Sequence, residues 1–420
     1  MAAMGPTSVL RMTDITIRPV TEDEYPAFVT AFMEGFSEDL PSESFVGIER
    51  ILLPPDRTLA AFEGDDIVGT FGGFDLSVTV PGGRSMPMEG TTVVTVFPTH
   101  RRMGLLRRMM AEHLDNAAQA GYPIAGLWAS ETDIYGRFGY GIATHLRSLK
   151  VSSPKIAFRD GVEIDRVRRI TQEQAAKELP PAYAAMRAQT PGMLARSPEW
   201  WEHYVLADEE WMRKGKTKRR YVVHDGPNGV DGYASYRSKG GESDDGHDNG
   251  TVHVVEVIAA TPRAEASLWS YLTHIDGAPN VESWNTPVDG TLRHMVKEPR
   301  RVRVTAVSDA LWIRILDVAA ALSGRQYEED GSVSITVTDP FRPGTSGSYR
   351  IDVADGQATV TPCDEGDIGM DIEVLGAAFL GGADALAYWR AGRIDGSLQD
   401  VSMFHRLFRT IRAPWIDTVF

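Results

Sequence analysis

The fold of the first third of this chain is decided by one stretch, Val94-Thr-Val-Phe-Pro-Thr-His-Arg-Arg-Met-Gly-Leu-Leu-Arg-Arg-Met-Met110. It continues the β-branched run that starts at Gly90, which predicts a strand ending near Phe97. Pro98 breaks the strand, and an amphipathic helix is expected from Arg102 to Ala120. Its apolar residues recur at spacings of three and four: Leu105, Leu106, Met109, Met110, Leu114 and Ala117.

The turn between this strand and helix is typical of an anion site. A helix N-terminus offers unpaired backbone N–H groups and a partial positive charge, which suits a pyrophosphate. Arg101 and Arg102 add charge, and Gly104 lets a ligand approach the backbone closely. The alternative is a surface helix with a solvated basic start. The strand before the turn and the amphipathic helix behind it favour the anion site.

Outward from this stretch, residues 13–150 read as a mixed α/β unit. A helix is expected to begin near Thr21, and Gly121 is expected to end the helix that follows Arg102. The expected helices span 22–34, 102–120 and 132–136, and the expected strands span 15–20, 57–62, 67–80, 90–97, 123–129 and 140–151.

A second α/β stretch spans 162–299, where the strand 253–259 leads into a helix at 267–274. This layout repeats the strand, turn and helix of the first stretch without the paired arginines and the glycine. The basic run 213–220 and the Gly-rich run 240–250 are interpreted as loops. From 301 onwards, strands at 302–307, 311–316, 333–338 and 349–353 alternate with helices at 317–323, 374–380 and 383–391, which suggests an α+β domain.

The composition excludes several classes of protein. A formal net charge of −15 argues against nucleic acid as the main partner and fits a cationic substrate, or serves only solubility. The single Cys363 allows no disulfide within the chain, which indicates a reducing compartment. No apolar run reaches the length of a membrane span, and Met1–Arg11 lacks the apolar stretch of a secretory signal. We therefore expect a soluble, cytoplasmic protein.

The motifs resemble those of a known superfamily. Arg101-Arg-Met-Gly-Leu-Leu106 is similar to the acetyl-CoA signature of the GCN5-related N-acetyltransferases (GNAT), except that Leu106 replaces a small residue. Ser130-Glu-Thr-Asp-Ile-Tyr-Gly-Arg-Phe-Gly-Tyr140 looks like the short helix and turn that follow in that superfamily. Both stretches resemble most closely the Eis family of actinobacterial acetyltransferases.

The resemblance implies three domains: a catalytic GNAT domain over 1–155, a degenerate second GNAT-like domain over 156–300, and a sterol-carrier-like α+β domain over 301–420. It implies acetyl-CoA as co-substrate, a homohexamer, and acetylation of aminoglycoside antibiotics at several amines. Acetylation of lysine on peptides or proteins is the alternative. A third possibility is a lipid-binding or scaffold protein with a vestigial donor site.

The resemblance also assigns the donor side of the site. It places Arg101, Arg102, Gly104 and Leu105 on acetyl-CoA, and it aims the backbone N–H groups of Val94 and Val96 at the thioester. Ser130 then positions the coenzyme or Tyr135, or it caps the short helix after it.

The resemblance makes Tyr135 the general acid for the departing thiolate. A phenol with a pKa near ~10 can donate to a thiolate of comparable basicity. The alternative is a tyrosine that only packs. The family's proposed base is the C-terminal carboxylate, here that of Phe420, which is a weak base and serves equally to attract the substrate ammonium.

On the acceptor side, Phe36 and Glu38 match positions that line the family's substrate pocket, unless they form a solvated acidic loop. Val419 stands where an acidic residue is expected. His100 is expected to shape its turn rather than transfer protons. The ten histidines are scattered without metal-ligand spacing, so no metal is expected.

Overall fold

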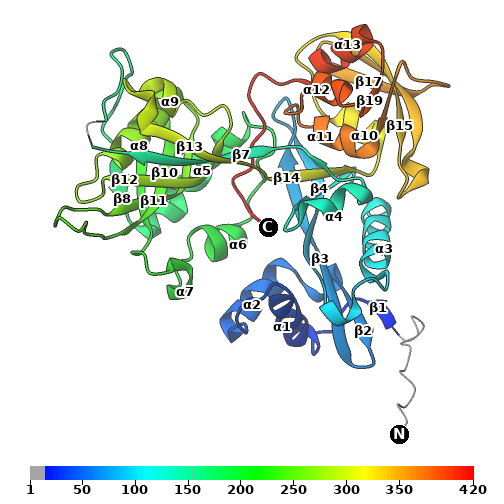
Figure 1. Ribbon diagram of the computed structural model, residues 1–420, viewed down its shortest axis with the longest axis horizontal. Coiled ribbons are helices and arrows are strands. Elements are labelled where there is room, and N and C mark those ends of the chain that lie inside the picture. The colour runs from blue at the N-terminus through cyan, green and yellow to red at the C-terminus, as the bar shows by residue number, and fades with distance from the viewer. Residues whose placement is uncertain (1–14, 155) are drawn as a thin grey trace, which may run out of the picture.

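A computed structural model describes residues 15–154 and 156–420, which form three β-sheets with helices around each (Figure 1). The segment Met1–Arg11, for which the sequence predicts no secretory signal, lies outside the described residues. Among the helices of these two ranges, none is both long and apolar enough to cross a membrane.

The first sheet has seven strands in the order β1-β2-β3-β4-β5-β14-β6. Only β4 and β5 are parallel, because helix α3 connects them as a crossover. The strands are β1 (Ile15–Arg18), β2 (Thr58–Glu63), β3 (Asp66–Thr79), β4 (Ser85–Val96), β5 (Ile124–Trp128), β14 (Leu311–Ile315) and β6 (Gly141–Ile142).

Four helices accompany this sheet: α1 (Tyr25–Gly35), α2 (Glu43–Leu52), α3 (Leu105–Gln119) and α4 (Thr132–Tyr135). Helix α3 begins later than the expected Arg102, because Arg102 and Gly104 both have positive φ angles and cannot continue a helix. Helix α2 was not expected. It starts at Ser42, whose hydroxyl accepts a hydrogen bond from the Phe45 N–H.

The second sheet repeats this plan in the order β13-β7-β12-β11-β10-β9-β8, with β11 and β12 as its one parallel pair in the described residues. The basic run Arg213–Arg220 connects α7 to β9, as the loop interpretation predicted. The strands are β7 (His145–Ser152), β8 (Arg168–Ile170), β9 (Arg220–Gly226), β10 (Gly229–Lys239), β11 (Thr251–Ala259), β12 (Asn280–Pro287) and β13 (Val302–Asp309). The helices are α5 (Gln172–Arg187), α6 (Pro198–Trp200), α7 (Glu210–Arg213), α8 (Pro262–Thr273) and α9 (Leu292–Met295).

The third sheet is five-stranded, in the order β17-β16-β15-β18-β19, with helices packed against it (Figure 1). Its strands are β15 (Gly331–Thr338), β16 (Gly347–Ala354), β17 (Gln357–Pro362), β18 (Ile368–Asp371) and β19 (Ile394–Gly396). The helices of this part are α10 (Val318–Gly324), α11 (Ile372–Ala378), α12 (Ala385–Arg390) and α13 (Leu398–Phe408).

Three strands lie in a different sheet from the one that the sequence suggested. Strand β7 was expected in the first domain but pairs with β12 and β13 of the second sheet. Strands β13 and β14 were expected in the third domain; β13 extends the second sheet, and β14 lies between β5 and β6 of the first. An alternating apolar pattern predicts a strand but contains no information on its partner.

After α13 the chain turns back from the third domain and runs between the other two, so that the C-terminus lies near the centre of the molecule (Figure 1). We call residues 409–420 the C-terminal tail. Trp415 and Ile416 in the middle of this tail are fully buried. The last residues are more open, since Val419 is exposed and Phe420 is half-buried.

Candidate active site

The parallel strands β4 and β5 separate in the middle of the first sheet. Their pairing runs from Met88 opposite Ile124 to Gly90 opposite Gly126 and then stops. Beyond this point β4 stays paired with β3, and β5 with β14. A bulge in β4, where Val93 has a φ of 45°, bends the strand away. The result is a gap in the sheet, bounded by the second half of β4 and the end of β5.

The backbone of β4 presents N–H groups to this gap. Past the bulge, the Phe97 N–H donates to the Val68 carbonyl on β3 at 3.0 Å. Because N–H directions alternate along a strand, the N–H groups of Val94 and Val96 point the other way, into the gap. These are the two residues whose backbone the family resemblance aims at the thioester.

The start of α3 is open to an anion. Its N-cap residue, Gly104, supplies no side chain to the first turn, and an added Cβ there would meet no protein atom within 4 Å. Within the part of the chain that the structure describes, the N–H groups of Leu105, Leu106 and Arg107 have no acceptor. Three free N–H groups at a helix start, together with its dipole, favour a phosphate group.

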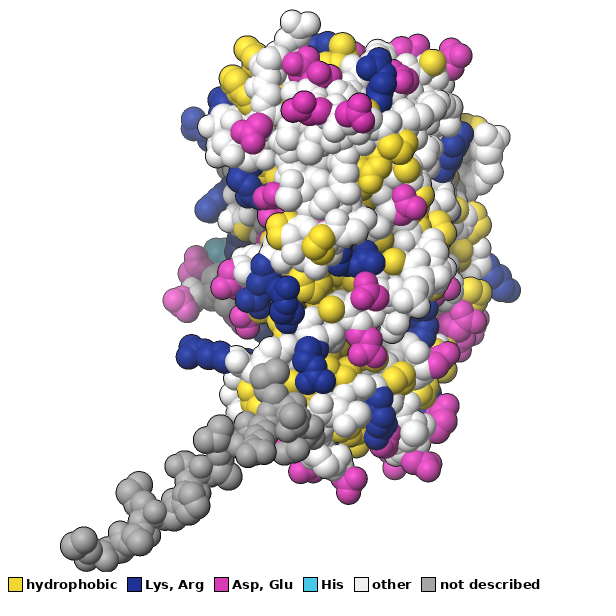
Figure 2. Space-filling view, turned by 90° about the vertical axis from the view of Figure 1, so that its right-hand side faces the viewer, with side chains coloured by type: hydrophobic (Ala, Val, Ile, Leu, Met, Phe, Trp, Pro, Cys, Tyr) yellow, Lys and Arg dark blue, Asp and Glu magenta, His cyan; other side chains and the backbone are white. Residues whose placement is uncertain are grey.

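Arginines surround this helix start. Arg101 and Arg102 are both exposed, and Arg101 Nε lies 3.5 Å from the Val96 carbonyl oxygen. Among the described residues, neither they nor Arg107 and Arg108 form an ion pair with a carboxylate. Figure 2 shows Lys and Arg side chains gathered near the middle of the face on which α3 lies. A chain with a net charge of −15 thus offers a local positive surface beside the gap.

His100 belongs to the scaffold of the turn. Its Nδ1 lies 2.8 Å from the Thr99 hydroxyl and its Nε2 lies 3.2 Å from a Glu63 carboxylate oxygen. With both ring nitrogens engaged and the residue buried, His100 fixes the loop between β4 and α3.

Tyr135 is the last residue of the short helix α4, which follows the carboxyl end of β5. It is buried, and its ring packs edge-on against Tyr140 at 6.2 Å. Tyr140 is in turn hydrogen-bonded to the Thr91 hydroxyl, at the point on β4 where the gap begins. Burial raises the pKa of Tyr135, and the Ser130 hydroxyl beside it partly offsets this shift. The phenol is therefore protonated at neutral pH.

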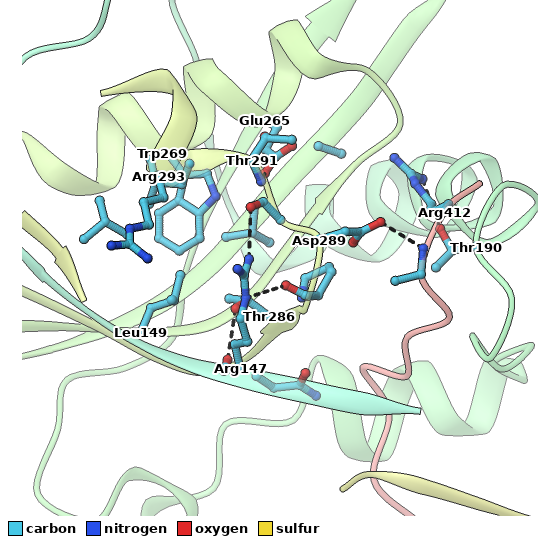
Figure 3. A pocket seen from close by; sticks show the side chains of 18 of the residues that line it. Arg147, Leu149, Thr190, Glu265, Trp269, Thr286, Asp289, Thr291, Arg293 and Arg412 are labelled. Atoms are coloured by element: carbon cyan, nitrogen blue, oxygen red, sulfur yellow. Dashed lines mark hydrogen bonds between the residues drawn. The ribbon is translucent and has the colours of Figure 1, made fainter. Parts of the chain in front are cut away.

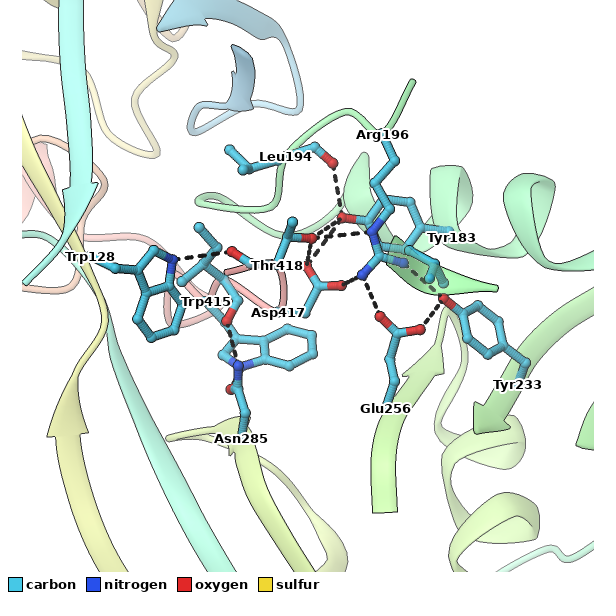
Figure 4. A network of polar contacts seen from close by, with 12 residues as sticks. Trp128, Tyr183, Leu194, Arg196, Tyr233, Glu256, Asn285, Trp415, Asp417 and Thr418 are labelled. Atoms are coloured by element: carbon cyan, nitrogen blue, oxygen red, sulfur yellow. Dashed lines mark hydrogen bonds and ion pairs between the residues drawn. The ribbon is translucent and has the colours of Figure 1, made fainter. Parts of the chain in front are cut away.

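The C-terminal end of the chain approaches the first sheet from the face opposite to Tyr135. The Trp128 indole N–H at the end of β5 donates to the Thr418 carbonyl at 3.1 Å (Figure 4). The Phe420 ring packs edge-on against Phe74 on β3, 6.4 Å between centroids. Phe420 packs with the core on the α1 side, whereas Tyr135 belongs to the core around α3. The two residues thus approach the gap from its two sides.

The acceptor side contains the end of α1. Gly35 is so close to β4 that a Cβ on it would lie 2.7 Å from Thr95 Cβ, which places the following Phe36 and Glu38 beside the gap. Both side chains are exposed, Phe36 by 43%. Val419, where an acid was expected, is also exposed and contributes no charge.

Several residues near the chain end were missed from the sequence. Trp200 packs edge-on against Phe74 and stacks on Tyr204, whose hydroxyl donates to the buried Glu49 on α2. Burial raises the pKa of Glu49, and the bond from Tyr204 opposes that shift. The side of the gap next to Phe420 is therefore lined by aromatic rings from two domains. The only signal in the sequence was the aromatic pair at 200–201.

Residues 15–154 and 156–420 contain no group of three or more His, Cys, Asp or Glu arranged to bind a metal ion. The chain brings backbone N–H groups of β4 to the gap, and Tyr135 and Phe420 pack in the cores on its two sides.

Comparison with known proteins agrees with this geometry. Residues 16–143 and 192–315 each match the acetyltransferase (GNAT) domain family, and residues 318–417 match the sterol carrier protein domain family. The chain is 35% identical to an uncharacterized N-acetyltransferase of Streptomyces avermitilis, over 98% of this chain and 100% of that protein. It is 34% identical to the N-acetyltransferase Eis of Mycobacterium tuberculosis, over 94% and 96% of the two chains.

The structure of Eis1 from Mycobacterium abscessus covers 97% of this chain and 100% of its own, with a TM-score of 0.83 and 29% identity. This chain belongs to the Eis family of GCN5-related N-acetyltransferases. A GCN5-related N-acetyltransferase from Anabaena variabilis shares the fold at only 17% identity, with a TM-score of 0.82.

As an Eis-family chain, the protein is an N-acetyltransferase, and its GNAT domains imply acetyl-CoA as co-substrate. The predicted fold of two GNAT domains followed by a sterol-carrier-like α+β domain is confirmed. The open start of α3, the arginines around it and the free space over Gly104 fit the phosphates of such a donor.

Proposed function

We propose that this enzyme transfers the acetyl group of acetyl-CoA to amines of polycationic small molecules such as aminoglycosides, at several positions. The observation that carries the proposal is the gap between β4 and β5. One of its sides has the open α3 start, and on the other side the Phe420 ring packs among aromatic rings. A cationic, multiply hydroxylated amine suits the acceptor side because carboxylates pair with ammonium groups and aromatic rings cover sugar faces.

On the donor side, Arg101, Arg102 and the N–H groups around Gly104 and Leu105 would hold the pyrophosphate. Ser130 would position Tyr135 or the coenzyme. When the amine attacks the acetyl carbon, negative charge develops on the carbonyl oxygen, and the N–H groups of Val94 and Val96 would stabilise it. The carbon–sulfur bond then breaks, and Tyr135 would give its proton to the leaving thiolate.

On the acceptor side, Phe36 and Glu38 would bind the substrate, and the carboxylate of Phe420 would attract its ammonium group. The same carboxylate would accept the proton that the nitrogen loses, directly or through water. A carboxylate is a weak base in water. The surrounding aromatic rings would exclude water from it, and this desolvation would make it a stronger base.

The test is a screen for CoA release with aminoglycosides, linear polyamines and lysine peptides at matched concentrations. Turnover of aminoglycosides well above that of lysine peptides supports the proposal, and the reverse order would identify a protein lysine acetyltransferase. A vestigial site in a lipid-binding or scaffold protein predicts no thermal stabilisation by acetyl-CoA, whereas saturation at about 100 times Kd should add ~2.7 kcal/mol.

We also propose that the enzyme is a cytoplasmic homohexamer. The single Cys363 fits a reducing compartment, and exposed apolar residues such as Val307 and Ile411 are candidates for subunit contacts. Light scattering of the untagged protein at micromolar concentration should give the mass of six chains. A monomeric mass there would disprove this assembly.

A further inference from the structure

The second domain has the same gap in its sheet as the first. Its parallel strands β11 and β12 pair from Thr251 opposite Asn280 to Val254 opposite Ser283 and then part. Beyond that point β11 follows β10, and β12 follows β7. Two GNAT domains therefore give this chain two sheet gaps, of which only the first has the Arg-Arg-x-Gly turn.

The helix start at the second gap is closed to a phosphate. The Thr261 hydroxyl accepts a hydrogen bond from the Ala264 N–H at 3.2 Å, and Pro262 has no N–H to offer. Glu265 adds a negative charge in the first turn of α8. Arg263 in the same turn is paired with Glu163 and Asp165, so its charge is not free for a ligand. A pyrophosphate is therefore disfavoured at this helix start.

The C-terminal tail lies in this second gap (Figure 4). On β12, the Asn285 side chain donates to the Ile416 carbonyl at 3.0 Å and accepts from the Trp415 indole at 2.6 Å. On β11, Glu256 is bridged to Asp417 by Arg196. Side chains from both parted strands therefore hold three consecutive tail residues.

Arg196 is the centre of this contact. Its guanidinium lies 2.5 Å from a Glu256 oxygen and 2.6 Å from an Asp417 oxygen, and its Nε donates to the Thr418 hydroxyl at 3.1 Å. It also stacks over the Tyr183 ring at 4.1 Å. Only 4% of the Arg196 side chain is exposed. A buried guanidinium with this many partners fixes them in one geometry.

The tail fills only part of the gap. Behind it remains a cavity of about 250 Å³ between Trp269 on α8 and Arg147 on β7 (Figure 3). The start of the tail forms one wall, where the Ala413 N–H donates to Asp289 at 2.9 Å and Arg412 donates to the Thr190 hydroxyl at 3.1 Å. The tail is therefore held at both ends of the buried stretch.

We infer that the gap of the second domain is a binding site for the chain's own C-terminal peptide, and that Arg196 is a positioning residue for the Phe420 carboxylate. Two residues separate Asp417 from Phe420, so a tail fixed at Asp417 and Thr418 leaves the chain end little freedom. The binding site stands on the contacts alone, whereas the effect on catalysis rests on the proposed role of Phe420.

Digestion of the full-length enzyme with a carboxypeptidase specific for aromatic ends measures tail binding independently of activity. Arg196→Met should speed the release of Phe420 at least tenfold and lower kcat more than it raises the KM of acetyl-CoA. Arg196→Lys keeps the charge but cannot bridge both carboxylates. Its rate of Phe420 release and its kcat should lie between those of the parent enzyme and Arg196→Met. Arg237→Met is the matched control: Arg237 is a buried arginine of the same domain that pairs with Asp208 and does not contact the tail.

Asn285→Ala serves as a second variant if Arg196→Met does not fold, because it removes two tail contacts without leaving a buried charge. If carboxypeptidase releases Phe420 no faster from these variants than from the parent enzyme, the proposed peptide-binding site is wrong. If the tail is released but kcat is unchanged, the binding site stands and the catalytic role of Phe420 fails.

Discussion

At the scale of single residues, the site brings together a buried phenol and arginines without carboxylate partners in the described part of the chain. Tyr135 is kept protonated by burial, and no charged partner competes for its proton among the hydrogen bonds of the described residues. Arg101 and Arg102 lack carboxylate partners there, so their charge is available to a ligand.

Replacing Tyr135 with Phe should lower kcat by ~10²–10⁴, the usual cost of losing a general acid. The KM of acetyl-CoA should hardly change, because the ring and its contact with Tyr140 remain. Steady-state kinetics over a range of leaving-group thiols checks this: acetyl donors with more acidic thiols should be less affected. An unchanged kcat, with chemistry shown to limit turnover, would remove Tyr135 from the mechanism.

Arg102→Gly should raise the KM of acetyl-CoA by about 10- to 100-fold, since one charge-assisted hydrogen bond is worth ~1.5–3 kcal/mol. Glycine is the suitable replacement because Arg102 has a φ of 64°, which glycine adopts without strain. Thermal stability should therefore be unaffected. Arg84→Gly, in the distant β3–β4 turn, is the control and should leave the donor KM unchanged; equal effects of the two would argue against the phosphate site.

At the scale of elements, the C-terminal tail should respond to pH. Asp417 faces Arg196, Glu256 on β11, Tyr183 on α5 and Tyr233 on β10. Burial raises the pKa of Asp417 from 3.8 to about 7; Arg196 opposes this, and Glu256 adds to it. The folded state thus holds a proton that the unfolded chain loses near pH 3.8. The contribution of Asp417 to the free energy of unfolding should therefore fall as the pH rises from about 4 to 7, and it should stay constant above pH 7.

Asp417→Asn isolates this effect. The other titrating groups contribute equally to the unfolding free energies of the variant and the parent, so their contributions drop out of the difference. Relative to the variant, the parent should lose ~1.4 kcal/mol of unfolding free energy per pH unit between about pH 5 and 7. Arg196 and Glu256 keep their charges throughout that range. Urea unfolding at several pH values measures the difference, and a difference independent of pH would show that Asp417 is ionised throughout.

The elements around the donor loop could be predicted because each has a local cause: β-branched residues in β4, Pro98 after it and the apolar spacing of α3. Helix α2 was missed because its apolar face is short and follows a run of acidic residues. Trp200 and Arg196 were missed for a different reason: they approach the first domain's site from the second domain. Their roles depend on tertiary contacts that no local pattern contains.

At the scale of the whole molecule, a buried ion pair joins the first sheet to the third domain. Arg314 on β14 contacts Asp339, just after β15, and both side chains are fully buried. Burial lowers the pKa of Arg314, and Asp339 counteracts that shift. The pair therefore couples the stability of the two units.

Asp339→Ala should destabilise the protein by ~3–5 kcal/mol, because it leaves the Arg314 charge buried without a partner. Asp352→Ala is the control: Asp352 pairs with Arg350 on the surface, where such pairs are worth at most ~1 kcal/mol. Thermal melts of the two variants measure the contrast. Similar melting temperatures would mean that water reaches Arg314 and replaces the carboxylate.

The position of β14 between β5 and β6 has a consequence for biosynthesis. Residue 311 must leave the ribosome before the first sheet can close, long after the donor loop has been made. Until then, the edges of β5 and β6 are unpaired, and such edges are sites of aggregation. A nascent chain of this protein therefore needs protection of these edges while residues 143–310 are being made. Strand β14 completes the first sheet and is made after the second domain, which holds the tail. The catalytic sheet can therefore form only once the second domain has been synthesised.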